Sequence, residues 1–205
     1  MTNNEQEKFW ADTYEVEYQQ RNSSFDQELG IECWRDMLSK AEPINSLLEC
    51  GCNIGRNLSF LDKMMPEASK SVIEISESAF KYVSHEYNLS ESFNGPIINS
   101  DFPESSFDLV YSTQVLIHIH PDELLDNMKK MFTYSNKYVL ICEYFNRTPT
   151  TIEYQGESDK LFKCDFGKLF IENFNVDLVD FGFQWGHIYD VAGFDDTTWW
   201  LFKKK

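Results

Sequence analysis

Residues 48–55 carry an acidic side chain, a tight turn and two glycines in an order typical of a small-ligand site. Glu49 stands near the end of a short apolar run, and Gly51 permits a backbone geometry and a close ligand approach that a Cβ would block. A helix that begins near Gly55 would offer free N–H groups at its N-terminus. The spacing lacks a glycine of the GxGxxG dinucleotide motif, which argues against a pyrophosphate. A strand-to-helix turn without a ligand is the alternative for this segment taken alone.

Two further positions extend the pattern toward a nucleoside. Glu74 closes a second apolar run, where an acidic side chain in alternating strand and helix folds accepts hydrogen bonds from ribose hydroxyls. Asp101 and Phe102 follow a third run and suit the exocyclic amine and the ring face of adenine. Singly, each has a structural explanation: a solvated strand end, a turn and a core side chain. Together, at the carboxyl ends of successive strands, they predict a nucleoside site.

The helices and strands that must position these residues can be predicted from the pattern of apolar residues after Asn45. Short apolar runs alternate with helical segments, which predicts an α/β fold with a mainly parallel sheet. We expect strands at residues 46–50, 71–75, 95–99, 107–112 and 137–142. We expect helices after the first, second and fourth strands, through 58–64, 78–87 and 121–132. The runs 176–183 and 197–202, with no convincing helix between them, predict an antiparallel C-terminal hairpin at one side of the sheet.

The first forty residues have a different, helical character. Phe9, Trp10, Tyr14 and Tyr18 recur at helical spacing and share one face. A second helical stretch covers 26–40 and is ended by Pro43. We therefore interpret residues 1–205 as a single domain, with a helical cap over 1–43 and the alternating core over 44–205.

Composition and charge exclude several classes of protein. The chain has 34 acidic and 18 basic residues, a formal charge of -16, which repels nucleic-acid backbones and anionic lipid surfaces. No apolar stretch approaches the roughly 20 residues that cross a bilayer, and the N-terminus does not resemble a signal, so we expect a cytoplasmic protein. The 5 cysteines suit reduced thiols in a reducing compartment. Neither Cys50-x-Cys52 nor His120 has the partners of a metal site.

The order of the candidate residues resembles the class I S-adenosylmethionine-dependent methyltransferases over about residues 45–145. The resemblance is carried by Glu49, Gly51, Asn53, Gly55, Glu74, Asp101 and Phe107-Asp108-Leu109-Val110. A narrower resemblance, to the pseudaminic acid biosynthesis-associated methylases, covers nearly the whole chain. Its motifs are Phe9-Trp10 through Tyr14, Tyr18 and Arg21-Asn22, then Val115-Leu116-Ile117-His118-Ile119, Glu143-Tyr144, Asp159-Lys160-Leu161-Phe162-Lys163 with Asp165-Phe166, and Asp196-Thr197-Thr198-Trp199. The resemblance implies a Rossmann-like methyltransferase sheet and an enzyme encoded near nonulosonic-acid sugar genes.

The resemblance also implies S-adenosylmethionine as the cofactor. It assigns the methionine part to Glu49, Gly51 and Gly55, the ribose hydroxyls to Glu74, and the adenine to Asp101 with Phe102. Asn53 stands where the broader class has glycine, and it agrees with the narrower family. By the same resemblance Arg21 pairs with the cofactor carboxylate, and Tyr14 with Trp10 covers the sulfonium, although helix packing is the alternative for these rings. Ile75 and Gln114 complete the residues that we assign to the cofactor.

Catalytic and acceptor residues are expected beside the transferred methyl group. The protein aligns the two reactants and, for a hydroxyl acceptor, removes its proton. We assign catalytic roles to His118, which follows the fourth strand, and to Glu143; a hydrogen bond from His118 to the backbone or the cofactor is the alternative. The residues assigned to the acceptor are Tyr144, Asn146, Tyr154, Lys160 and Lys163. This mixture suits a polyhydroxylated or anionic sugar, and ion pairing of the lysines with Asp159 or Asp165 is the alternative.

The sequence therefore predicts an S-adenosylmethionine-dependent methyltransferase that acts at oxygen or nitrogen of a sugar or a nonulosonic-acid-related small molecule. Two other functions stay open: methyl transfer to an unrelated metabolite, and cofactor binding without turnover in a partner or sensor protein. We expect no metal, no nucleic-acid partner and no membrane partner.

Overall fold

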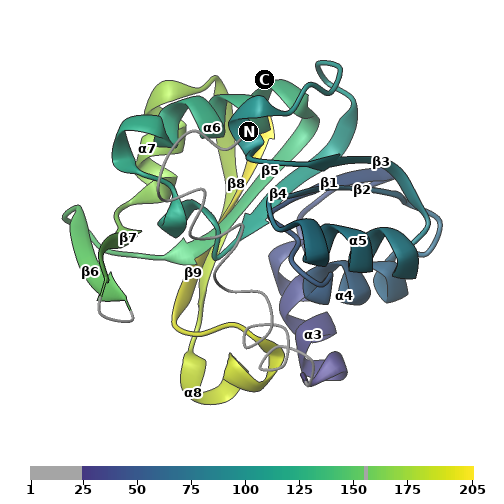
Figure 1. Ribbon diagram of the computed structural model, residues 1–205, viewed down its shortest axis with the longest axis horizontal. Helices are drawn as coiled ribbons and strands as arrows, with labels where there is room; N and C mark the ends of the chain where they lie inside the picture. The colour runs from purple at the N-terminus through teal and green to yellow at the C-terminus, as the bar shows by residue number, and fades with distance from the viewer. Residues whose placement is uncertain (1–24, 155–156) are drawn as a thin grey trace.

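The computed structural model describes residues 25–154 and 157–205, without the side chains of residues 153–160. The predicted aromatic helix before residue 25, with Tyr14 and Arg21, lies outside the described residues. The core is a 7-stranded sheet of order β3-β2-β1-β4-β5-β9-β8 (Figure 1). Its strands are β1 (Ser46–Cys50), β2 (Ser69–Glu74), β3 (Leu89–Asn94), β4 (Phe107–Thr113), β5 (Ser135–Tyr144), β8 (Val176–Gln184) and β9 (Thr197–Lys204).

The first five strands are parallel and the last two are not. β1 pairs in parallel with β2 and β4, β2 with β3, and β4 with β5. β9 lies antiparallel between β5 and β8. Both the mainly parallel sheet and the antiparallel C-terminal pair predicted from the sequence are confirmed. The carboxyl ends of the parallel strands meet at one edge of the sheet, as the candidate site requires.

Helices cover both faces of the sheet. Figure 1 shows α3 (Gln27–Met37), α4 (Arg56–Met64) and α5 (Glu77–Glu86) on one side and α6 (Pro121–Tyr134) with α7 (Phe166–Asn173) on the other. Strand residues alternate between the two layers, because successive side chains point to opposite faces. Leu47 packs in the core under α3 and α4, whereas Leu48 packs in the core with α6 and α7.

Local signals explain where the helices begin. Asp26 caps α3 by accepting the N–H of Leu29 at 3.0 Å, and Ser76 caps α5 by accepting the N–H of Ala79 at 3.3 Å. α7, which the sequence analysis does not predict, begins at Asp165, whose carboxylate accepts the N–H of Lys168 at 2.9 Å. The short elements α8 (Gly186–Tyr189) and η4 (Asp190–Ala192) likewise stand between β8 and β9, where no helix is expected.

The predicted third strand is wrong in its position. Residues 97–99 form the 3₁₀ turn η2 (Ile97–Asn99), and the strand is β3, which ends before Gly95. β3 is an edge strand and is largely exposed, so it lacks the apolar run that marks the buried strands. The left-handed φ of +153° at Gly95 and the following Pro96 then end the ladder.

The segment after β5 folds into a second, 2-stranded sheet. β6 (Thr150–Tyr154) and β7 (Glu157–Lys163) pair antiparallel and project from the main sheet (Figure 1). A bridge between Phe145 and Cys164 joins the base of this hairpin. Among the described residues, no helix has the length and apolar character needed to cross a membrane.

We predict that Gly30→Ala destabilises the fold by about 1–3 kcal/mol, although alanine favours a helix over glycine by about 1 kcal/mol. A Cβ at Gly30 would strike the ring of Phe60, which is fully buried and packs edge-on against Phe25. Urea unfolding followed by circular dichroism measures the change. In a Phe60→Leu background the same substitution should cost less, and an equal cost in both backgrounds would contradict a steric cause.

Candidate functional site

The turn between β1 and α4 is built from residues with left-handed backbone. Gly51, Asn53 and Gly55 have φ of +77°, +48° and +80°, a region that glycine enters freely and asparagine more readily than most side chains. The N–H of Gly51 donates to the carbonyl of Ile73 on β2 at 2.8 Å, which anchors the turn to the sheet. A Cβ at Gly51 would lie 2.6 Å from Val115, so glycine lets the loop after β4 approach this turn.

Glu74 joins that turn to the end of β2. Its carboxylate accepts the N–H of Asn53 at 2.6 Å and the N–H of Ser76 at 2.8 Å. The side chain is buried, and burial raises its pKa while the backbone hydrogen bonds oppose the shift. The backbone of Ile75 also hydrogen-bonds to this carboxylate, and since a carboxylate can accept about four hydrogen bonds, capacity is left for about one more donor. Ile75, also predicted to bind the cofactor, follows directly and is half-buried.

Glu49 lies beneath the turn rather than at its surface. It is fully buried and accepts hydrogen bonds from Asn57 Nδ2 at 3.2 Å and from the Tyr111 hydroxyl at 3.0 Å. Asn57 in turn accepts the indole N–H of Trp34 on α3 at 3.4 Å. Burial raises the pKa of Glu49 to about 8. The predicted contact of Glu49 with the cofactor stays a prediction, and its observed contacts support the turn from within the core.

The end of β4 carries a chain of polar contacts that runs across the sheet edge. Gln114, with φ of +57°, accepts from Arg56 Nη2 at 3.2 Å and donates to the Tyr144 hydroxyl at 3.2 Å. The Tyr144 hydroxyl donates to Asp195 at 3.3 Å. Gly193 lies against the Arg56 guanidinium, where a Cβ would collide with it. Two predicted residues, Gln114 and Tyr144, are therefore brought together.

His118 is the last residue of the turn η3 (Leu116–His118), and Glu143 lies against the first residues of the same turn. His118 ends the turn and is half-buried. Glu143, on β5, is fully buried and its carboxylate accepts the N–H groups of Val115 at 3.1 Å and Leu116 at 2.9 Å. Burial raises the pKa of Glu143 to about 7. The two catalytic assignments are thus close in the fold, and their chemical roles stay predictions.

Asp101 and Phe102 follow η2 and diverge. Asp101 is exposed, whereas the Phe102 ring packs edge-on against Phe107 and Tyr134 in the core. The structure therefore leaves Asp101 as the accessible member of the pair assigned to the adenine.

Three of the predicted acceptor residues, Tyr144, Asn146 and Lys163, lie where β5 meets the β6–β7 hairpin. The Lys163 ammonium lies 4.6 Å from the centre of the Tyr144 ring, and the Asn146 amide donates to the Thr150 hydroxyl at 2.7 Å. Tyr154 and Lys160 belong to β6 and β7, but their side chains lie outside the described residues.

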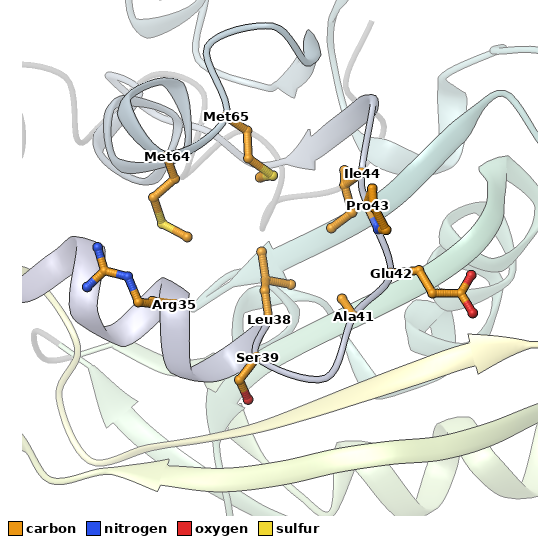
Figure 2. A pocket seen from close by; sticks show the side chains of 9 residues that line it. All are labelled: Arg35, Leu38, Ser39, Ala41, Glu42, Pro43, Ile44, Met64 and Met65. Carbon is orange, nitrogen blue, oxygen red and sulfur yellow. The ribbon is translucent and has the colours of Figure 1, made fainter.

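The described residues contain no cluster of metal-binding side chains, and the 5 cysteines are free and buried. A hollow of about 260 Å³ lies at the opposite, amino edge of the sheet, before β1 and after α4. Figure 2 shows Met64 and Met65 pointing into it toward Leu38. None of the candidate residues lines this hollow.

Solved structures of known methyltransferases share the fold of this chain. A methyltransferase of Leishmania major described as S-adenosylmethionine-dependent superposes with a TM-score of 0.76 at 16% identity, over 97% of this chain and 81% of that one. The magnesium protoporphyrin IX methyltransferase of Synechocystis, crystallised with S-adenosylmethionine, gives 0.70 at 11% identity over 100% of both chains. The 1,6-didemethyltoxoflavin N1-methyltransferase of Burkholderia thailandensis, crystallised with S-adenosylhomocysteine, gives 0.65 at 12% identity over 87% and 78%.

The sequence comparison is more specific than these likenesses of fold. Residues 48–135 match the family model described as a methyltransferase domain, and they contain the glycine turn, Glu74 and the loop after β4. The chain is an S-adenosylmethionine-dependent methyltransferase with the fold of the class I methyltransferases. No curated protein sequence matches it.

The residues of this methyltransferase fit its cofactor. The Glu74 carboxylate is held by backbone N–H groups at the carboxyl edge of the sheet and keeps acceptor capacity for a ligand hydroxyl. Arg56, which the sequence analysis missed, supplies a cation beside Gln114. A signal for it was available, because a cation at the first position of a helix opposes the helix dipole and so needs another reason to be there.

We predict that Glu49→Gln changes how the stability of the methyltransferase depends on pH. Because the pKa of Glu49 rises from 4.5 to about 8 on folding, the folded wild type holds a proton that the unfolded chain releases. The contribution of Glu49 to the free energy of unfolding is therefore full below about pH 4.5 and is lost as pH rises toward about 8. Glutamine mimics the protonated acid and does not titrate, so the variant should lose less stability over this range, by on the order of a few kcal/mol.

Urea unfolding at pH 5 and at pH 8.5 measures the difference. Both proteins share the other buried carboxyl groups, so only their difference reports on Glu49. Parallel pH profiles for the two proteins would show that Glu49 is ionised in the fold.

Proposed function

We propose that this methyltransferase transfers a methyl group to oxygen or nitrogen of a small, hydroxylated and anionic acceptor, a sugar or a nonulosonic-acid derivative, in the cytoplasm. The observation that carries the proposal is the Lys163 ammonium over the Tyr144 ring, 4.6 Å from its centre. In a chain of formal charge -16, this cation stands beside the hydrogen-bonded chain of side chains that runs from Arg56 through Gln114 and Tyr144 to Asp195. A carboxylate on the acceptor would pair with it.

The cofactor would lie along the carboxyl edge of the sheet. Glu74 would accept the ribose hydroxyls, Asp101 the adenine amine, and Arg56 the methionine carboxylate, together with Arg21 as the resemblance implies. When bound, S-adenosylmethionine supplies an electrophilic methyl group. Gly51, Asn53 and Gly55 shape the turn on which it would rest.

The side chains of the protein align the acceptor and manage its proton. Gln114 and Tyr144 would line one side of the acceptor site in a fixed orientation, because each is held by hydrogen bonds to its neighbours. His118, on the turn η3 that follows Gln114, would take the proton from an acceptor hydroxyl. Tyr154, Lys160 and Asn146 on the hairpin side would contact the rest of the acceptor.

The similar structures are consistent with a small acceptor but do not select one. Among them are methyltransferases named for a toxoflavin precursor, for plantazolicin and for magnesium protoporphyrin IX. Since one fold serves many acceptors, a metabolite unrelated to sugars is the second candidate. The chain's negative charge supports the exclusion of nucleic acid as acceptor.

Replacing Glu74 by alanine should weaken S-adenosylhomocysteine binding at least tenfold, because the ribose hydroxyls would lose their acceptor. Titration calorimetry measures this, with NAD as a ligand that should not bind. Glu77→Ala is the matched control, since Glu77 is exposed on α5 and pairs with Lys81. Unchanged affinity in Glu74→Ala, with an unchanged melting temperature, would remove Glu74 from the cofactor site.

For the acceptor, we expect labelled methyl to pass from S-adenosylmethionine to free or nucleotide-linked nonulosonic acids but poorly to their neutral amides. Lys163→Ala should raise KM for the acid about tenfold with little change in kcat, because the cation binds rather than reacts. Lys168→Ala, at an exposed site on α7 that pairs with Glu172, is the control.

Equal use of acid and amide would contradict recognition of an anion. If cofactor binds and no sugar is labelled, the acceptor is another metabolite or the protein binds the cofactor without turnover.

A further inference from the structure

Glu143 places a carboxyl group under the turn that follows β4. One carboxylate oxygen accepts the N–H groups of Val115 at 3.1 Å and Leu116 at 2.9 Å, together with the Ser112 hydroxyl at 3.2 Å. The other oxygen faces the N–H of Ile117 at 3.4 Å. These amides begin a 3₁₀ turn and so have no partners of their own within it. A side chain from the neighbouring strand therefore acts as the cap of this turn.

The capped turn contacts the cofactor side of the site. Val115 lies directly on Gly51, so closely that a Cβ there would come within 2.6 Å. The position of Val115 thus sets how the glycine turn and the loop after β4 fit together.

The same turn carries the residues of the acceptor side. Gln114 precedes it in a left-handed conformation and bridges Arg56 to Tyr144. His118 ends it. A shift of the backbone at residues 115–117 would therefore move both Gln114 and His118.

We propose that Glu143 is a positioning residue: by holding the amides of Val115, Leu116 and Ile117, it sets the glycine turn, Gln114 and His118 in one arrangement. The inference rests on the proposed function, in which η3 borders the site of methyl transfer. It gives Glu143 a role through the turn rather than by contact with the acceptor, since its carboxylate is fully buried.

Asp108, near the amino end of β4, offers a matched control away from the candidate site. It is a buried acid on β4, the strand next to that of Glu143, and it too holds a loop. Its carboxylate accepts the N–H of Asn45 at 2.8 Å and pairs with Lys137 at 3.1 Å. Asp108→Ala therefore removes a buried carboxylate of similar kind without touching η3.

The experiment compares Glu143→Ala, Glu143→Gln and Asp108→Ala by amide hydrogen exchange and by calorimetry with S-adenosylhomocysteine. In Glu143→Ala, exchange at residues 115–117 should rise at least tenfold and affinity should fall about tenfold. Glu143→Gln should restore affinity to within about threefold, because its amide oxygen still accepts from Val115 and Leu116. Asp108→Ala should lose stability but change neither quantity by more than about twofold.

Unchanged protection of residues 115–117 in Glu143→Ala would overturn the proposal. So would a loss of affinity in Asp108→Ala equal to that in Glu143→Ala, since it would trace the effect to general stability. If Glu143→Ala does not fold, Glu143→Asp, whose shorter side chain cannot reach the amides, should show the same local exchange. A wild type that fails to bind S-adenosylhomocysteine would refute the proposed function, while the exchange data would still decide whether Glu143 holds the turn.

Discussion

The candidate site depends on buried carboxylates that accept backbone amides at the carboxyl edge of the sheet. Glu74 holds the glycine turn to β2, and Glu143 holds the turn after β4 to β5. Loops at such an edge have few partners within their own backbone, and an unpaired buried amide is costly. Each carboxylate satisfies two or more N–H groups, at least one of them from a different segment, so it links its own strand to another loop.

Burying these carboxyl groups disfavours their charged form, and hydrogen-bond donors around them partly offset that cost. Burial raises the pKa of Glu49, Glu74 and Glu143, because a charge loses hydration in the interior. For Glu74 and Glu143 the opposing contribution comes from backbone N–H groups, whereas for Glu49 it comes from Asn57 and Tyr111. The carboxyl groups that contact loops are therefore stabilised mainly by backbone N–H donors, and the one within the core is stabilised by side-chain donors.

The two edges of the sheet are used differently. At the carboxyl edge, Arg56 of α4, Gln114 directly after β4 and Tyr144 of β5 are joined by hydrogen bonds between their side chains. At the amino edge, Met64, Met65 and Leu38 line an apolar hollow. Parallel strands explain the difference, because all their carboxyl ends, and the loops that follow them, open on the same side.

Much of the fold could be predicted from the sequence because its signals are local. The buried strands β1, β4 and β5 have apolar runs, and Ser76 marks a helix start with its own side chain. The edge strand β3 was misplaced, since an exposed strand has no apolar run to distinguish it.

The sequence by itself determined the chemical kind of the site: a glycine turn after a first strand and an acid after a second, in the order of a class I methyltransferase. Only the tertiary structure decided which acids face the edge and which support it. Glu49, Glu143 and Asp101 are all acidic residues and look alike in the sequence. In the structure Glu49 and Glu143 are fully buried, whereas Asp101 is exposed. The physical reason is that burial and hydrogen-bond partners come from residues distant in sequence, such as Tyr111 for Glu49, and no local pattern encodes them.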